Sequence, residues 1–362
     1  MRTVRVGIIG CGGIANGKHM PALQKIEGVE MVAFCDIIEE RAQKSAEKFG
    51  VEGAKVYTDY KELLRDETIE VIHVCTPNRS HSFITVDALE AGKHVMCEKP
   101  MAKTYAEAKK MLEASERTGK KLTIGYQSRW RGDAQYLKQV CENDELGEIY
   151  YARAIALRRR AVPTWGVFLN EYEQGGGPLI DIGTHALDLT LWMMNNYKPK
   201  MVVGTKYKKL GDQKQTANAW GDWDPKEYTV EDSAFGFVVM ENGATVSVES
   251  SWALNIADPQ EAICLVAGDK GGADMLGDKL RINYVKNNRQ VIEEPDFKSG
   301  GVAFFDGDQG GSPADLEARA WIDAVVNDTE PPTKASQAIV VTRILEAIYE
   351  SAETGKPVYF ED

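Results

Sequence analysis

A glycine-rich turn near the start of the chain constrains the fold more than any other feature. The segment VRVGIIGCGGIA places an apolar run, residues 4–9, directly before Gly10, Gly12 and Ala15. In a strand–turn–helix unit the first glycine permits the tight turn, the second lets a pyrophosphate approach the backbone, and the small third residue lets the helix pack on the sheet. The spacing predicts a dinucleotide site, which also includes Gly13 and Ile14.

An acidic residue in the expected place supports this prediction. A second apolar run, residues 29–35, ends at Asp36, where a carboxylate can bind the ribose hydroxyls of NAD. The same carboxylate disfavours NADP, because a 2′-phosphate about 4 Å away would cost roughly 4 kcal/mol at an effective dielectric near 20. The predicted cofactor is therefore NAD.

Length, charge and cysteine usage limit the number of domains and the classes of partner and site that this chain can have. A chain of 362 residues exceeds the usual size of one hydrophobic core, which predicts two domains. The formal net charge of -12 disfavours nucleic acid and anionic membranes as partners. The six cysteines form no CxxC pair, and no apolar run is as long as a membrane span. We expect a cytoplasmic protein with reduced thiols and no metal site.

Strands and helices alternate through residues 1–125, which predicts a doubly wound parallel sheet. Such sheets bind ligands outside the carboxyl ends of their strands. We therefore expect the residues after the strands to converge on the cofactor: Thr76, Pro77, Asn78, Glu98, Lys99 and Pro100. His81 begins the next helix, where it is either a helix cap or a further cofactor contact.

Lys99 is the first candidate for the chemistry. It lies between a carboxylate and a proline at a strand end. Partial burial there disfavours the charged ammonium, so the amine can exchange a proton or polarise a substrate hydroxyl. The alternative is a solvated lysine paired with Glu98, and the position at the strand end favours the catalytic interpretation.

Strandlike segments replace the alternation in the second half. They predict an open antiparallel sheet with one covered face and one face for a partner subunit. The segments span residues 149–157, 201–207, 233–240, 244–252 and 261–268. Asn242-Gly243 predicts a two-residue type I′ hairpin turn between the third and fourth segments. We set the domain boundary after residue 125, giving domains of residues 1–125 and 126–362.

A helix expected over residues 179–196 carries the second candidate group. Asp181, His185 and Asp188 share one face of it. On a buried face, an imidazole beside a carboxylate can take the proton of an alcohol as a hydride leaves. A solvated salt-linked face, a core histidine and a metal pair are the alternatives. The nicotinamide domain favours catalysis by His185.

The turn fingerprint, the TPN and CEKP segments, and the GGGxxxDxGxH helix together resemble the Gfo/Idh/MocA family of NAD(P)-dependent sugar and polyol dehydrogenases. The resemblance spans nearly the whole chain. It implies an N-terminal Rossmann domain, a C-terminal α/β domain with a large open antiparallel sheet, and homodimers or homotetramers formed through that sheet. By this resemblance Lys99 is catalytic, His185 is the general acid–base, and Asp181 binds the substrate and orients the histidine. Gln127 would lie near the nicotinamide amide, and Glu98 would contact the ribose.

Departures from the family pattern narrow the range of substrates that we expect. Glucose–fructose oxidoreductases tend to carry tyrosine at the position of His185, and inositol dehydrogenases usually have aspartate at that of Ala186. Residues 158–189 most resemble members that oxidise the C3 hydroxyl of glucosides. We therefore expect hydride transfer between NAD and a ring secondary hydroxyl, at C3, of a sugar or glycoside.

Three alternatives to this function remain open. One is an inositol or polyol 2-dehydrogenase, and another is an NAD-dependent glycoside-cleaving enzyme that oxidises C3 transiently. The third is a nicotinamide-bound regulator without chemistry, which the presence of both Lys99 and His185 disfavours.

Residues upstream of the second candidate helix are candidates for substrate contacts. Trp165 is placed to stack on the apolar face of a pyranose, and Trp220 and Trp223 are candidates to extend this wall. A place in the core or at a subunit contact is the alternative for these indoles. Arg158 is a candidate ligand for sugar hydroxyls or a carboxylate. The acidic chain, without a clear phosphate cradle in its second half, favours a neutral substrate.

Overall fold

The computed structural model describes residues 2–213, 216–297 and 311–360. The chain divides into two compact units. The first consists of Met1–Gln127 and Asp308–Ile339, and the second of Ser128–Gly307 and Val340–Asp362. A segment from near the end of the chain therefore belongs to the first unit, although the strand–helix alternation of the first 125 residues gives no sign of it.

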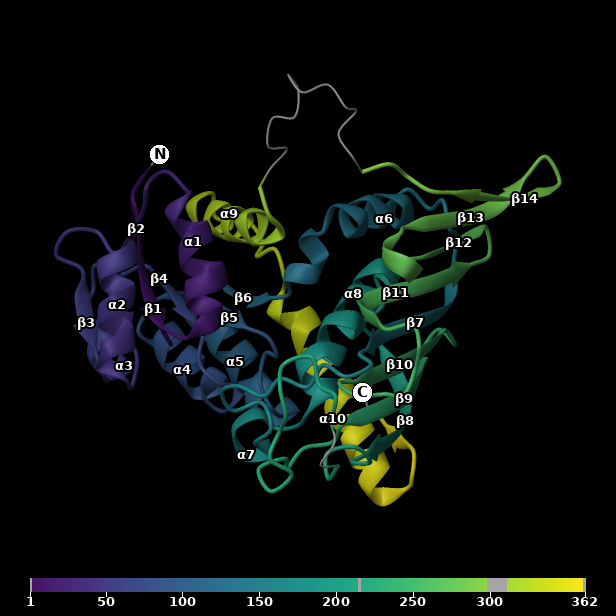
Figure 1. Ribbon diagram of the computed structural model, residues 1–362. Coiled ribbons are helices and arrows are strands. Elements are labelled where there is room, and N and C mark those ends of the chain that lie inside the picture. Colours follow the sequence, from purple (N-terminus) through teal and green to yellow (C-terminus); the bar gives the residue numbers. More distant parts are fainter. Residues whose placement is uncertain (1, 214–215, 298–310, 361–362) are drawn as a thin grey trace. The chain divides into compact units, whose positions relative to one another are not determined.

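The first unit is built on a six-stranded parallel sheet with the order β3-β2-β1-β4-β5-β6 (Figure 1). Its strands are β1 (Val4–Ile9), β2 (Val29–Cys35), β3 (Lys55–Tyr57), β4 (Val71–Val74), β5 (His94–Glu98) and β6 (Leu122–Gly125). The chain order reverses between β1 and β4, the point at which doubly wound sheets bind dinucleotides. The predicted Rossmann architecture is confirmed.

Helices connect these strands. They are α1 (Met20–Gln24), α2 (Glu39–Phe49), α3 (Tyr60–Leu64), α4 (Asn78–Glu90) and α5 (Tyr105–Thr118). Helix α9 (Pro313–Val326) packs beside α1, although it lies near the other end of the chain (Figure 1). Trp321 and Ile322 of α9 are buried in the same core cluster as Val6 and Ile8 of β1. This apolar burial attaches α9 to the Rossmann unit.

The second unit contains a nine-stranded sheet with the order β14-β13-β12-β11-β7-β10-β9-β8-β15. Its strands are β7 (Ile149–Leu157), β8 (Pro199–Tyr207), β9 (Ser233–Met240), β10 (Thr245–Ser251), β11 (Gln260–Gly268), β12 (Gly271–Asp274), β13 (Arg281–Lys286), β14 (Arg289–Glu293) and β15 (Val358–Tyr359). The neighbours are antiparallel except β7 and β10, which are parallel. The sheet is mixed rather than purely antiparallel, because the chain crosses over through two α-helices, a π-helical turn and two strands between β7 and β10.

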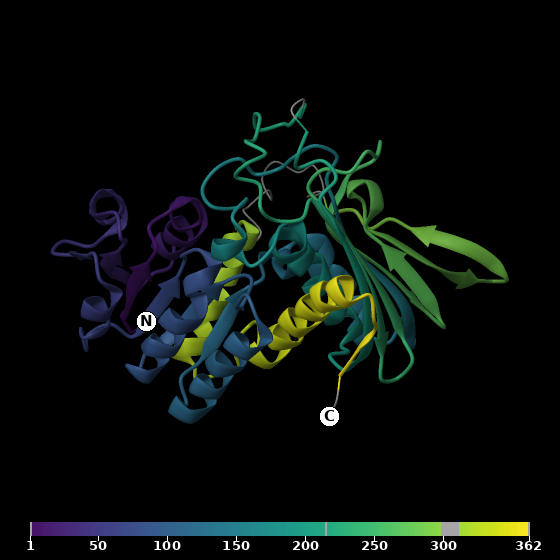
Figure 2. The same cartoon turned by 90° about the horizontal axis from the view of Figure 1, so that it is seen from below.

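One face of this sheet is covered by helices and the other is open (Figure 2). Helix α8 (Thr184–Met194) packs on β7 and β11, and α6 (Gly132–Glu142) packs on α8. The C-terminal part of α10 (Ala335–Thr354) lies against β8 and β9, where Gly204 and Gly236 face Ile348. Val246 and Val248 of β10 are buried on the covered face, as their alternation predicts.

The hairpin between β9 and β10 differs from the prediction. Residues 241–243 form the connection, and the N–H of Met240 donates to the carbonyl oxygen of Ala244 at 2.8 Å. Gly243 has φ of +87°, but Asn242 is not among the residues with positive φ. A type I′ turn needs positive φ at both central residues, so this loop is the three-residue kind with a left-handed glycine.

None of the helices in the described part of the chain combines the length and apolar character that a membrane crossing requires.

The close approach of α10 to the large sheet gives a test of the packing. A Cβ at Gly204 would lie 2.5 Å from the carbonyl oxygen of Ile348, so Gly204→Ala forces helix and strand apart. We expect a loss of about 1–3 kcal/mol in the free energy of unfolding, measured by urea titration. Gly132→Ala is the matched control, because no described heavy atom lies within 4 Å of its added Cβ. Equal stability of the two variants would contradict the packing.

Candidate active site

The turn after β1 has the geometry that a pyrophosphate requires. Gly10 has φ of +92°, and a Cβ there would lie 2.7 Å from the backbone of Cys75 at the end of β4. Only glycine fits between these two strand ends. At Gly12 and Gly13, by contrast, an added Cβ meets no described heavy atom within 4 Å, and Ile14 is 41% exposed. Open space for a ligand therefore borders the turn.

Asp36 is fixed beside this turn. Its carboxylate accepts hydrogen bonds from the N–H groups of Cys11 and Ile38, both at 2.9 Å. The side-chain amide of Asn16 donates to the carbonyl oxygens of Cys11 and Gly12 at 2.8 and 3.0 Å. Acid and turn thus form one hydrogen-bonded unit. It fits NAD, with the ribose hydroxyls beside the carboxylate and the pyrophosphate over the glycines.

His81 connects the ends of β4 and β5. Its Nε2 lies 2.9 Å from the carbonyl oxygen of Thr76, and its Nδ1 lies 2.8 Å from that of Pro100. The ring is fully buried, and burial lowers its pKa. Both ring nitrogens therefore face backbone carbonyl oxygens, and the neutral imidazole donates to one of them. His81 holds in place the loops that begin with Thr76-Pro77-Asn78 and Lys99-Pro100.

Glu98 lies at the centre of a buried charged cluster. Its Oε1 lies 2.7 Å from Nζ of Lys18 and 2.8 Å from Nε2 of His19, and its Oε2 accepts from the N–H of Lys99 at 3.1 Å. Burial alone would raise its pKa, but the charge of Lys18 and the hydrogen bond from His19 hold it well below the usual range. A ribose contact by Glu98 would compete with all of these partners.

Helix α9 contributes a second carboxylate to this cluster. Glu317 lies 2.9 Å from Nζ of Lys18, and both side chains are buried. Burial alone would lower the pKa of Lys18, but the charges of Glu317 and Glu98 raise it. The pKa of Glu317 is raised by burial despite the neighbouring ammonium. One lysine therefore joins β5 to α9 beneath the dinucleotide turn.

Two histidines, His19 and His73, belong to the cluster. Glu98 is ionised and can only accept, so Nε2 of His19 carries a proton. The Nδ1 atoms of His19 and His73 lie 2.9 Å apart. Burial holds the pKa of His73 well below its usual range, and its Nε2 has no hydrogen-bond partner among the described residues. His73 is therefore neutral, and its Nδ1 shares one hydrogen bond with Nδ1 of His19.

In the second unit, Asp181 and His185 lie where a π-helical turn, Leu179–Gly183, passes into α8. Oδ2 of Asp181 accepts a hydrogen bond from Nε1 of Trp252 at 3.0 Å, and His185 is 9% exposed. Turns of this kind are rare and concentrate at functional sites. The other described π-helical turn, Ala15–His19, follows the dinucleotide fingerprint.

The glycine run before Asp181 permits a close approach of other chain segments. A Cβ at Gly177 would lie 2.3 Å from the carbonyl oxygen of Glu231, and one at Gly176 would lie 2.2 Å from the hydroxyl of Tyr349. The buried carboxylate of Glu231 accepts from the N–H groups of Gly177 and Leu179, at 2.8 and 3.2 Å, and from the Tyr349 hydroxyl at 2.8 Å. Glu231 thus anchors the start of the helix.

Asp188 has a structural partner. Arg129 donates to its two carboxylate oxygens at 2.8 and 2.6 Å, and both side chains are buried. Burial raises the pKa of Asp188, although the charge of Arg129 opposes this. The ion pair fixes α8 at Asp188, which lies less than one helical turn after His185.

The aromatic residues upstream of the helix divide into two groups. Trp165 and Trp220 are 52% and 44% exposed, and their ring centroids lie 5.0 Å apart. Trp223 is buried and donates from Nε1 to the carbonyl oxygen of Gly211 at 2.9 Å, so it does not extend the exposed wall. Arg158 pairs with Glu261 through two nitrogens and lies over the Trp220 ring.

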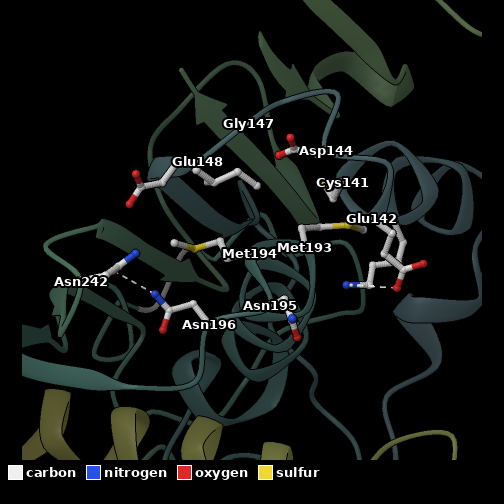
Figure 3. A pocket seen from close by; sticks show the side chains of 12 residues that line it. Cys141, Glu142, Asp144, Gly147, Glu148, Met193, Met194, Asn195, Asn196 and Asn242 are labelled. Atoms are coloured by element: carbon white, nitrogen blue, oxygen red, sulfur yellow. Dashed lines mark hydrogen bonds and ion pairs between the residues drawn. The ribbon is translucent and has the colours of Figure 1, made fainter. Parts of the chain in front are cut away.

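A pocket of about 670 Å³ lies at the opposite end of α8 (Figure 3). Met193 and Met194 line it, and Asn196 donates to Asn242 at its rim at 3.0 Å. Neither Asp181 nor His185 is among its lining residues. No group of three or more His, Cys, Asp or Glu side chains among the described residues is placed to hold a metal ion.

Sequence models of known families match both units. An oxidoreductase family model described as an NAD-binding Rossmann fold matches residues 4–126, and its C-terminal α/β domain matches residues 138–360. The chain belongs to the Gfo/Idh/MocA family. It is an oxidoreductase with an NAD-binding Rossmann domain, as the resemblance implied.

Relatives of known activity extend this assignment. The chain is 38% identical to the D-glucoside 3-dehydrogenase of Escherichia coli over 355 residues, which cover 98% of this chain and 97% of the relative. It is 30% identical to an inositol 2-dehydrogenase of Salmonella typhimurium over 275 residues, which cover 75% and 74%.

Solved structures share the fold. Levoglucosan dehydrogenase in complex with NADH has a TM-score of 0.83 at 21% identity, with 99% of each chain covered. The aldose–aldose oxidoreductase from Caulobacter crescentus has a TM-score of 0.80 at 23% identity and covers 99% of this chain and 100% of its own.

Sequence reasoning missed the residues that hold the candidate groups in place. The burial of Trp252 could be predicted, because alternation along its strand puts it on the covered face of the sheet. Glu231, Lys18 and His73 carry no such signal, since their partners lie far away in the sequence.

The buried cluster predicts a large asymmetry between two lysines. Lys18→Met leaves the buried Glu98 and Glu317 carboxylates without their counter-charge, so we expect a loss of about 3–5 kcal/mol in the free energy of unfolding. Lys44→Met is the control, because Lys44 pairs with Glu40 on the surface. Urea titration of both variants measures the difference, and a Lys18→Met protein as stable as the control would contradict the cluster.

Proposed function

We propose that the protein transfers a hydride between NAD and a ring secondary hydroxyl, at C3, of a glucoside or related sugar. The observation that carries this proposal is that Asp181, oriented by Trp252, lies in a π-helical turn four residues before the buried His185 of α8. Identity of 38% to a D-glucoside 3-dehydrogenase over nearly the whole chain supports the substrate class and the position.

Residues of both units take part in the proposed reaction. Bound NAD supplies the hydride acceptor. His185 takes the proton of the substrate hydroxyl as the carbonyl forms, and Asp181 binds the sugar and orients the imidazole. Lys99 polarises the same hydroxyl, and Trp165 and Arg158 are the further substrate contacts. The residues proposed to contact NAD are Gly10, Gly12, Gly13, Ile14, Asp36, Thr76, Pro77, Asn78, Lys99 and Gln127, and His81 and Glu98 are proposed to support this site by holding the backbone around it.

Two other reactions use the same groups. Oxidation of inositol has support from 30% identity to an inositol 2-dehydrogenase, but over only 75% of the chain. Cleavage of a glycoside through transient C3 oxidation begins with the step proposed here and differs in its product. We place both below plain dehydrogenation of a glucoside.

The wider setting is also proposed. The first domain, predicted over residues 1–125 and joined by α9, holds the cofactor, and the second, from the remainder of the predicted range 126–362, holds the substrate and forms the oligomer contact. The net charge of -12 disfavours nucleic acid as a partner, and six free cysteines suit the reducing cytoplasm.

We further propose that the open face of the large sheet joins copies of this chain. Val203 and Phe237 occupy neighbouring strands on this face and are 39% and 48% exposed. Exposed apolar side chains in register on a sheet favour burial against a like surface.

A charge on the open face tests this oligomer. Phe237→Asp should lower the sedimentation mass to that of one chain, because a carboxylate cannot be buried in an apolar contact. Phe83→Asp is the matched control, since Phe83 is 45% exposed on α4, outside the sheet. An unchanged mass of the Phe237→Asp protein would refute the proposed contact.

Replacement of the proposed chemical groups tests the function itself. We expect Lys99→Met and His185→Ala each to reduce turnover of a glucoside by about 10²- to 10⁴-fold, because each removes a positioned proton-transfer or polarising group. NAD binding by His185→Ala, measured by calorimetry, should change little. NMR of the product should locate the new ketone at C3. Near-normal turnover by either variant would reject its role, and a ketone elsewhere would reject the regiochemistry.

A further inference from the structure

Two indoles of the second unit form an exposed aromatic corner, which we define as Trp165 and Trp220. Their rings meet edge to face, at an interplanar angle of 76° and a centroid distance of 5.0 Å. Both side chains are about half exposed. Large aromatic side chains left in water on neighbouring loops contribute little to folding, so their exposure points to a ligand.

Hydrogen bonds hold the two loops of this corner together. The N–H of Val162 donates to Oδ1 of Asn218 at 2.8 Å, and Nδ2 of Asn218 donates to the carbonyl oxygen of Val162 at 2.9 Å. The hydroxyl of Thr164 donates to the carbonyl oxygen of Trp220 at 2.7 Å. The corner is therefore preorganised, which limits the entropy lost on binding.

The corner is joined to the proposed sugar site by aromatic contacts. Phe168 lies edge to face with Trp165 at a centroid distance of 5.9 Å and with Trp252 at 6.5 Å. Trp252 in turn donates its indole N–H to Asp181. This chain of contacts, from Trp165 through Phe168 and Trp252 to Asp181, connects the corner to the proposed sugar site within the second unit.

The charge at the corner favours a neutral occupant. The guanidinium of Arg158 lies 5.2 Å from the centroid of Trp220 and backs its ring. The two-nitrogen ion pair with Glu261 and a bond to the carbonyl oxygen of Ala161 neutralise and fix that guanidinium. An anion gains little from a cation that is already paired, whereas a flat neutral ring gains contact with two indoles.

We propose that Trp165 and Trp220 form a subsite for a planar aromatic aglycone of the glucoside. This inference rests on the proposed function and deepens it. A pyranose stacks on one aromatic face, but two perpendicular indoles offer a face and an edge, the arrangement that aromatic rings prefer. Trp165 therefore contacts the aglycone rather than the sugar ring.

Phenyl β-glucoside and methyl β-glucoside distinguish the aglycone from the sugar. The ratio of their kcat/KM values measures aglycone recognition alone. We expect Trp165→Ala and Trp220→Ala each to lower the phenyl-to-methyl ratio about threefold to tenfold, and the double variant to lower it further. Trp220→Phe should restore part of the ratio. Tyr359→Ala, at a 65% exposed aromatic of β15, is the control and should leave the ratio unchanged.

Two results would overturn the subsite. An equal loss with both substrates would assign the indoles to the sugar ring, and an unchanged ratio would leave them without a role in recognition. Calorimetry of phenyl β-glucoside binding in the presence of NADH, which cannot accept a hydride, on wild type and the double variant, requires no turnover. It therefore separates failure of the subsite from failure of the proposed reaction: weaker binding by the double variant supports the subsite even without catalysis, and equal binding refutes it.

Discussion

A carboxylate without surrounding water must be neutralised by the protein, and Glu98 imposes this requirement on the first unit. Its position at the end of β5 brings Lys18 and His19 from the turn after β1, and through Lys18 it brings Glu317 from α9. Removal of one partner would leave an uncompensated buried charge, which is far more costly than loss of a surface ion pair. The cluster thus joins three distant parts of the chain beneath the cofactor turn.

The second unit also has buried carboxylates with protein partners beside its candidate groups. Glu231 accepts backbone hydrogen bonds at the start of the helix that carries Asp181, and Asp188 pairs with Arg129 just beyond His185. In the first unit Glu98 holds the backbone of Lys99. Each proposed chemical group therefore lies close in sequence to a backbone or side-chain group that a buried acid holds in place. Such anchoring fits sites in which small displacements of a proton-transfer group reduce the rate.

The sequence was informative where local pattern decides structure. The fingerprint turn, the alternating strands and helices, and five of the nine strands described in the second unit follow from apolar periodicity and glycine spacing, whereas β12 to β15 were not predicted. Local pattern could not predict the parallel pairing of β7 with β10, because pairing depends on the path of the whole chain. The hairpin after β9 contained Asn242-Gly243 but formed a three-residue loop, since strand register rather than the dipeptide sets loop length.

The sequence singled out candidate residues for the site but not the contacts that hold them in place. Lys99, His185 and Asp181 stood out through motif position. The partners of Glu98 and of Asp181 did not, because a buried polar contact between remote segments leaves no periodic trace. Trp223 looked like part of the exposed wall and is instead a buried donor to Gly211.

Transfer of the C3 hydrogen as a hydride is the central claim, and isotopic labelling tests it most directly. Methyl or phenyl β-glucoside carrying deuterium at C3 would be incubated with the enzyme and NAD, and the nicotinamide C4 position would be examined by NMR. The account predicts deuterium at C4 of the reduced cofactor, with slower turnover than for the unlabelled sugar. Reduced cofactor without deuterium, or product that keeps its label while NAD remains oxidised, would contradict it.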